Sequence, residues 1–126
     1  MHNKAEQHMH ERMSRAEQRN HEEEQVLDTI AKHKLRFVHV RALNWATLQI
    51  HHKGGCTIAY TLPPRKGDSL IEVAVALVHH NDAFCKRTGR FVVCRNWTAG
   101  ATLSLRVPKN TTPATFLKAM FSVMVN

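Results

Sequence analysis

A change of hydrophobic pattern at His33 is the feature that most constrains how this chain can fold. From Lys4 to Lys32 the sequence has no proline or glycine, is rich in residues that favour helices and is poor in apolar residues. After His33 apolar residues recur at every second position, which is the period of a half-buried β-strand. We therefore predict an exposed N-terminal helix over residues 1–33 and a basic α+β domain over residues 34–126.

The spacing of residues in the N-terminal helix leaves two alternatives open. Positions three and four residues apart resemble the seam of a coiled coil: Met9, Met13, Ala16, Asn20, Glu23, Leu27 and Ile30. Polar side chains occupy the middle of this seam, where a coiled coil needs apolar ones. Either the helix mediates a homodimer, or only its last two turns dock on the domain while its start frays and is partly disordered.

Five segments of the domain have the alternation or the apolar content of strands. They are residues 35–43, 44–52, 56–62, 69–80 and 102–108. Gly54 and Gly55 separate the second and third segments, and because both tolerate positive φ we predict a tight hairpin there. The fourth segment is apolar on both faces apart from Glu72, which predicts a central strand. The expected fold is α+β, with an antiparallel sheet of about five strands.

The end of the chain has the signals of a helix that packs on this sheet. Thr112 is a good N-cap, and Pro113 fits the first helical position. One face of the predicted helix carries Phe116, Ala119, Met120 and Val123, and we expect this face to cover the sheet. Because apolar residues continue around the helix at Leu117, Phe121 and Met124, it is either deeply buried or part of a partner surface.

Positive charge is concentrated in the domain. Residues 34–126 contain thirteen of the 18 lysines and arginines but only three of the ten acidic residues, so their net charge is +10. Residues 1–33 carry the other seven acids and have a net charge of −2. A basic excess of this size attracts polyanions or acidic protein surfaces. We therefore expect the partner to be nucleic acid or an acidic protein complex.

The stretch NDAFCKRTGR, residues 81–90, is the centre of the predicted binding surface. Asp82 has the character of an N-cap and Gly89 that of a helix end, so we predict a short helical turn between them within an irregular segment. Arginine forks suit phosphate or carboxylate, and neighbouring aromatic rings can stack on bases. The predicted contact residues are Lys86, Arg87, Arg90, Arg95 and Trp97, together with Lys53, Arg65 and Lys66, which either extend the same patch or lie at the opposite end of the sheet.

The pattern Asp82-x-Phe84-x-Lys86-Arg87-x-Gly89-Arg90, which follows an apolar strand, resembles a segment of small accessory proteins of tailed bacteriophages. In those proteins it runs roughly Asp-x-Phe-x-Arg-Lys-x-Gly-Arg. A second Gly-Arg pair expected soon after it is replaced here by residues 92–95, Val-Val-Cys-Arg. The resemblance implies a phage origin and a non-enzymatic role in the infected bacterium, such as inhibition of a host nucleoprotein or a defence complex by occlusion.

Histidines and cysteines provide the alternative function, a metal-dependent nuclease. His51 and His79 lie at the ends of two predicted strands, and with Cys85 they would make a zinc site if those ends adjoin. Adjacent strand residues point to opposite faces, however, and the sequence has no C-x-x-C or H-E-x-x-H motif. We therefore expect no metal and no cofactor, and we favour a binding protein over an enzyme.

The start of the sequence, MHNKAEQHMHERM, lacks the basic-then-apolar layout of a secretory signal. No apolar run approaches the roughly 20 residues that a membrane-spanning helix needs. We expect a cytoplasmic protein that does not interact with membranes, located in the bacterial host if the protein is phage-encoded.

Overall fold

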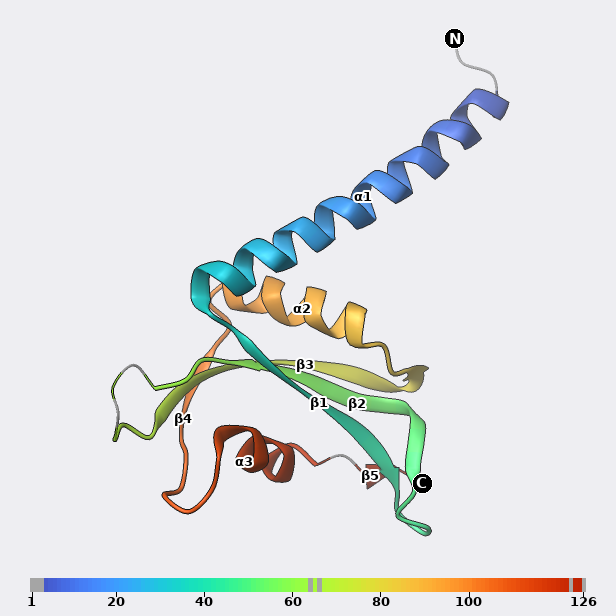
Figure 1. Cartoon of the computed structure of the whole chain (residues 1–126). Coiled ribbons are helices and arrows are strands. Elements are labelled where there is room, and N and C mark those ends of the chain that lie inside the picture. The colour runs from blue at the N-terminus through green and yellow to red at the C-terminus, as the bar shows by residue number, and fades with distance from the viewer. Residues whose placement is uncertain (1–3, 64, 66, 123, 126) are drawn as a thin grey trace.

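The computed structural model describes the chain except for residues 1–3, 64, 66, 123 and 126 (Figure 1). In chain order its elements are α1 (Lys4–His33), β1 (Arg36–Asn44), β2 (Ile50–Tyr60), β3 (Leu70–Ala83), α2 (Lys86–Thr98), β4 (Leu103–Arg106), α3 (Pro113–Met120) and β5 (Met124–Val125). A helix with the length and apolar content needed to cross a membrane does not occur among the described residues.

The sheet has the strand order β4-β3-β2-β1-β5. β1 pairs with β2, β2 with β3 and β3 with β4, all antiparallel. β5 contains only two residues and pairs with β1 in parallel. The predicted α+β class, the N-terminal helix and the C-terminal helix are confirmed, whereas the antiparallel part of the sheet has four strands rather than about five.

Helices cover both faces of this sheet, with α1 and α2 on one side and α3 on the other (Figure 1). Ala59 of β2 packs in the core under α2, with Val93 and Trp97. Its neighbour Ile58 points to the opposite face and packs in the core that includes Leu117 of α3. The alternation along β2 thus divides the interior into two layers, as a strand period of two requires.

α1 is anchored to the body only near its end. Val26 and Ile30 pack against the core under α2. Leu27, in the same turns, is 64% exposed. The earlier part of the helix extends away from the sheet (Figure 1). The homodimer through α1 stays a prediction.

The predicted hairpin at Gly54 and Gly55 is wrong, because both glycines lie inside β2. Their φ angles are 78° and 114°, and the β2–β3 register shifts between Lys53 and Gly55. A Cβ on Gly55 would clash with the backbone carbonyl oxygen of Val40 and would lie 3.0 Å from Cδ2 of Phe84. The two glycines therefore allow a strand irregularity and a close approach by Phe84. These features need the same conformational freedom as the predicted hairpin turn.

The chain turns instead within residues 45–49, which we expected to belong to a strand. The Oδ1 atom of Asn44 accepts hydrogen bonds from the N–H groups of Ala46 at 2.9 Å and Thr47 at 3.1 Å. Leu48 has a φ of 59°, in the left-handed region. A local side-chain cap thus outweighs the apolar alternation of this segment, and the second strand begins only at Ile50.

The short basic turn predicted around Gly89 is also wrong, because Gly89 lies inside the 13-residue helix α2. Asp82, predicted as an N-cap, is part of β3, and the N-cap is Cys85. Gly89 is buried, as are Val93 and Trp97 further along the helix. Packing of this face on the sheet overrides the low helix propensity of the glycine.

α3 begins as predicted, but only part of the expected face packs on the sheet. Phe116 packs against the core as expected, and Val123 lies outside the described residues. The Thr112 side chain accepts a hydrogen bond from the N–H of Thr115 at 3.2 Å, and Pro113 is the first residue of the helix. Leu117 is fully buried, whereas Met120, expected on the sheet side, is 52% exposed. The helix is apolar nearly all round, so its sequence does not specify which face packs.

Candidate functional site

The connection from β3 to α2 sets the position of the candidate site. The Phe84 N–H, one residue beyond β3, donates to the carbonyl oxygen of His52 at 3.1 Å. α2 then begins at Lys86, with Cys85 as an N-cap that makes no side-chain capping hydrogen bond. This connection brings the basic start of α2 to the end of the sheet where β2 begins and β3 ends.

Gly89 determines how closely α2 lies on the sheet. A Cβ at this position would be 2.8 Å from the Cβ of Thr57 in β2, closer than real Cβ contacts. Only glycine therefore fits at this crossing of helix and strand. The close approach places Lys86 and Arg90, on either side of Gly89, beside the first two strands.

Three cations gather there around His39 and Phe84; we call Arg41, Lys86 and Arg90 the β1–α2 cluster. The guanidinium carbon of Arg41 lies 5.0 Å from the ring centroid of Phe84. The ring of His39 meets Phe84 edge-on, with 5.9 Å between centroids. Lys86 and Arg90 are close enough for their charges to act on His39. Arg41 and Lys86 are exposed and Arg90 is half-buried.

His39 is the centre of this arrangement. Its Nδ1 lies 3.0 Å from the hydroxyl oxygen of Thr57, which is itself buried. Burial lowers the pKa of His39, and the positive charges of Lys86 and Arg90 lower it further. The imidazole is therefore neutral at neutral pH, and the positive charge of the cluster comes from the lysine and the two arginines.

An apolar groove of about 780 Å³ adjoins the cluster, between α1, the start of β1 and the first half of α2. Its lining includes the rings of Phe37 and Phe91, the cations Arg87 and Arg90, and the acidic residues Glu22 and Glu23 of α1. Phe37 also stacks on His39, with ring planes 11° apart. The groove and the cluster thus form one continuous surface that has aromatic rings and cations side by side.

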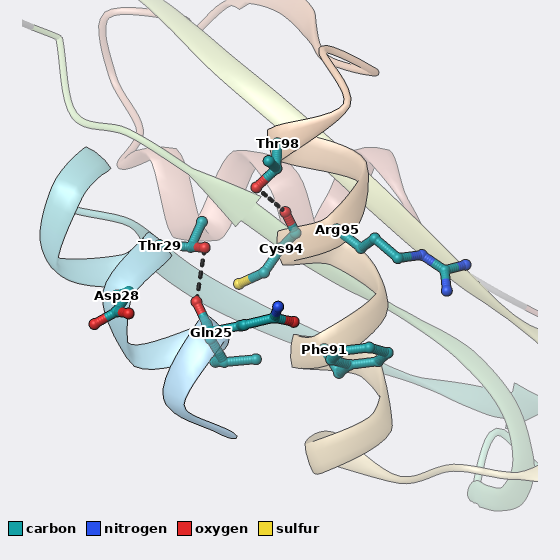
Figure 2. Close-up of a pocket in the computed structure, with 8 residues that line it drawn as sticks. Gln25, Asp28, Thr29, Phe91, Cys94, Arg95 and Thr98 are labelled. Atoms are coloured by element: carbon teal, nitrogen blue, oxygen red, sulfur yellow. Dashed lines mark hydrogen bonds between the residues drawn. The ribbon is translucent and has the colours of Figure 1, made fainter. Parts of the chain in front are cut away.

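The other two basic residues of α2 have partners. Arg87 Nε lies 3.0 Å from a carboxylate oxygen of Glu23 in α1. The guanidinium carbon of Arg95 lies 5.8 Å from the ring centroid of Phe91. Figure 2 shows Arg95 extending away from α1, while the thiol of Cys94 points into the hollow between the two helices. The predicted cations of α2 therefore fall into two groups: Arg87 and Arg95 have partners within the protein, and Lys86 and Arg90 belong to the cluster.

That hollow, of about 360 Å³, is lined by residues of α1 and α2 (Figure 2). The hydroxyl groups of Thr29 and Thr98 donate to the carbonyl oxygens of Gln25 and Cys94, at 2.8 and 3.0 Å, so each bonds within its own helix. Burial raises the pKa of the Cys94 thiol, and the charge of Arg90 opposes this effect. A thiol kept protonated is a poor nucleophile.

The remaining predicted contact residues are widely separated. Trp97 is only 8% exposed and packs against His33, with 6.0 Å between ring centroids, so it is a core residue rather than an exposed stacking platform. Lys53 is paired with Ala83 in the ladder, at the same end of the sheet as the cluster. Arg65 lies in the β2–β3 loop at the opposite end. Lys66 lies outside the described residues.

Sequence reasoning missed Arg41, His39 and Phe37. These three residues alternate along β1 and share the face that α2 partly covers. The signal for one shared face was present in the alternation of LRFVHVRAL. The sequence could not show that this face meets the start of α2, because that depends on the strand order and on the contact between Gly89 and Thr57.

The candidate metal ligands do not converge. The Nδ1 atom of His51 accepts from the N–H of Lys53 at 3.1 Å, and that of His79 accepts from the N–H of Asn81 at 3.2 Å. Cys85 is exposed, and a hydrogen bond with the side chain of Thr88 lowers the pKa of its thiol. Within the described part of the chain, no group of three or more His, Cys, Asp or Glu residues is arranged to hold a metal ion.

Comparison with known proteins adds no relative: no family model, curated protein or solved structure matches this chain.

Proposed function

We propose that this protein binds single-stranded nucleic acid through the β1–α2 cluster and the adjoining groove, and that it acts by occlusion without chemical change. The observation that carries the proposal is the convergence of Arg41, Lys86 and Arg90 from separate elements. Among the described residues, none of the three forms an ion pair with a carboxylate. Cations without a protein counterion are available to neutralise phosphates, which releases condensed counterions and drives binding.

The groove supports a single-stranded ligand in particular. Phe37 and Phe91 offer aromatic surface next to Arg90, and bases of a single strand stack on such rings irrespective of sequence. A base paired within a duplex does not expose its ring face to the protein. The alternation of rings and cations therefore fits an unpaired strand whose phosphates contact the cluster.

The resemblance of residues 82–90 to accessory proteins of tailed phages supports the biological setting that we propose. In that setting the protein is phage-encoded and occupies nucleic acid that a host nucleoprotein or defence complex would otherwise engage. The pattern joins the end of β3 to the first turns of α2. It thus covers Lys86 and Arg90 of the cluster but not Arg41.

An acidic protein surface is the second candidate partner, and one contact favours it. The ion pair between Arg87 and Glu23 shows that α2 accommodates a carboxylate presented by a neighbouring helix. A partner with an acidic helix would use the same kind of pair. This candidate explains the charge of the surface but gives no role to the aromatic groove.

Two double variants with the same change in net charge test the proposal. Arg41→Glu/Lys86→Glu reverses exposed cations of the cluster, and Arg65→Glu/Lys109→Glu reverses exposed cations at the other end of the sheet. Affinity is measured by fluorescence anisotropy with short single-stranded DNA, single-stranded RNA and duplex DNA of mixed sequence. The cluster variant should bind single strands on the order of 100-fold more weakly, because two charge-assisted contacts are lost, and the control variant only a few-fold.

Equal losses in the two double variants would show that net charge rather than the cluster governs binding. Tighter binding of duplex than of single strands would remove the role of the groove. If poly-glutamate displaced the oligonucleotide at an equal concentration of charge, the acidic-protein alternative would replace the proposed function.

A further inference from the structure

His39 lies among the cations that would contact phosphate. This placement couples protonation of His39 to phosphate binding. On α2, Lys86 and Arg90 act on the imidazole, and on β1 it stacks on Phe37. On β2 the hydroxyl of Thr57 lies 3.0 Å from Nδ1, and the ring of Phe84, in the connection to α2, is nearly perpendicular to the imidazole. Arg41 lies against the same Phe84 ring. Among the described residues, no carboxylate acts on His39.

The hydrogen bond to Thr57 can persist in both protonation states of His39. A neutral imidazole can accept or donate at Nδ1, whereas a charged imidazolium donates at both ring nitrogens. A hydroxyl group can take either role, so Thr57 can donate to the neutral ring and accept from the charged one. Protonation of His39 therefore requires no rearrangement of the packed strand face.

Two effects keep the free protein from holding a proton on His39: burial, and repulsion by Lys86 and Arg90. A phosphate group bound among the cations adds negative charge within the same few ångströms and offsets this repulsion. By linkage, a phosphate that favours the charged imidazolium is itself bound more tightly when the imidazolium is present.

We infer that His39 takes up a proton from solvent when a phosphate group of single-stranded nucleic acid binds between Arg41, Lys86 and Arg90. The inference rests on the proposed function and adds a regulatory property to that site. Binding tightens as the pH falls from neutral to mildly acidic values. The limit is about tenfold in affinity for each pH unit, as uptake of one proton requires.

The direct test uses the unmodified full-length protein and NMR titration of its histidine ring protons, with and without a saturating short single-stranded DNA. The midpoint of the His39 titration should move to higher pH in the complex. His33, which packs on Trp97 at the other end of α2, serves as an internal reference. The signals of its ring protons should be the same with and without DNA. A bound complex in which the His39 midpoint is unchanged overturns the inference and leaves the proposed function intact.

A matched pair of variants provides a second readout. His39→Asn keeps a side chain able to bond Thr57 but cannot titrate, and His21→Asn removes an exposed histidine of α1 that bonds Gln25. The affinity of His39→Asn should depend less steeply on pH than that of the wild type, whereas His21→Asn should match the wild type. Equal pH dependence in all three proteins contradicts the inference. Absence of DNA binding at every pH overturns the proposed function as well.

Discussion

The basic residues of α2 fall into two groups with different surroundings. Arg87 pairs with Glu23 of α1, and Arg95 lies over Phe91. Lys86 and Arg90 act on His39 of β1, and neither pairs with a carboxylate of the described residues. The comparison shows that the availability of a cation depends on which side chains reach it. Glu23 lines the groove that Arg87 and Arg90 share, but its ion pair is with Arg87.

The largest expected effect comes from a variant that disrupts the close contact between α2 and β2, on which the position of both groups of cations depends. Gly89→Ala would place a Cβ 2.8 Å from the Cβ of Thr57. Alanine normally stabilises a helix interior by about 1 kcal/mol relative to glycine, but overpacking here outweighs that gain. We expect a net loss of about 2 kcal/mol in the free energy of unfolding, measured by chemical denaturation.

The control for this variant is Thr88→Ala, at the adjacent exposed position of α2. Its free energy of unfolding should stay within about 0.5 kcal/mol of the wild-type value. A Gly89→Ala protein as stable as the wild type would mean that α2 does not sit on β2 as closely as described. The cluster would then lose its structural basis.

The next effect tests the comparison between the two groups of cations directly. Arg90→Gln should weaken binding to single-stranded DNA by about tenfold, because a charge-assisted contact to phosphate is worth roughly 1.5 kcal/mol. Arg87→Gln makes the same change in net charge but removes a cation already paired with Glu23, so its effect should stay within a few-fold. Anisotropy titrations at one fixed salt concentration measure both. Equal losses would contradict the distinction between the two groups of cations.

The smallest effect is expected from a variant that frees Arg87 from its ion pair with Glu23. Glu23→Gln removes its partner carboxylate, so Arg87 becomes available and the affinity for single-stranded DNA should rise two- to threefold. The stability cost should be below about 1 kcal/mol, since the ion pair is exposed. Glu24→Gln, an exposed neighbour with the same charge change, controls for net charge. The same rise in both variants would show that the pair itself does not matter.

Several features of the fold could be predicted because their causes are local. The spacing of apolar residues changes at His33, where α1 ends, and the alternation of residues 35–43 predicts β1. Thr112 and Pro113 mark the start of α3, because capping depends only on the N-cap residue and the first turn of the helix. The basic character of the domain follows from composition.

The errors arose where one residue type serves two purposes. Gly54 and Gly55 have the conformations of a turn but occupy a strand irregularity beneath Phe84. Gly89 has the appearance of a helix end but is a packing contact inside α2. A local pattern cannot distinguish these uses, because the deciding atoms are distant in the sequence. For Gly55 they include Phe84 in the β3–α2 connection, and for Gly89 they belong to Thr57 of β2.

The sequence by itself therefore determined the helical arm, the alternating strands and the positive charge of the domain, since each depends on residues close together in the chain. Only the tertiary structure decided which cations act together. It joined Arg41 of β1 to Lys86 and Arg90 of α2 around His39, paired Arg87 with α1 and buried Trp97. The physical reason is that an electrostatic site depends on distances through space, and here those distances are set by strand order and by one glycine contact.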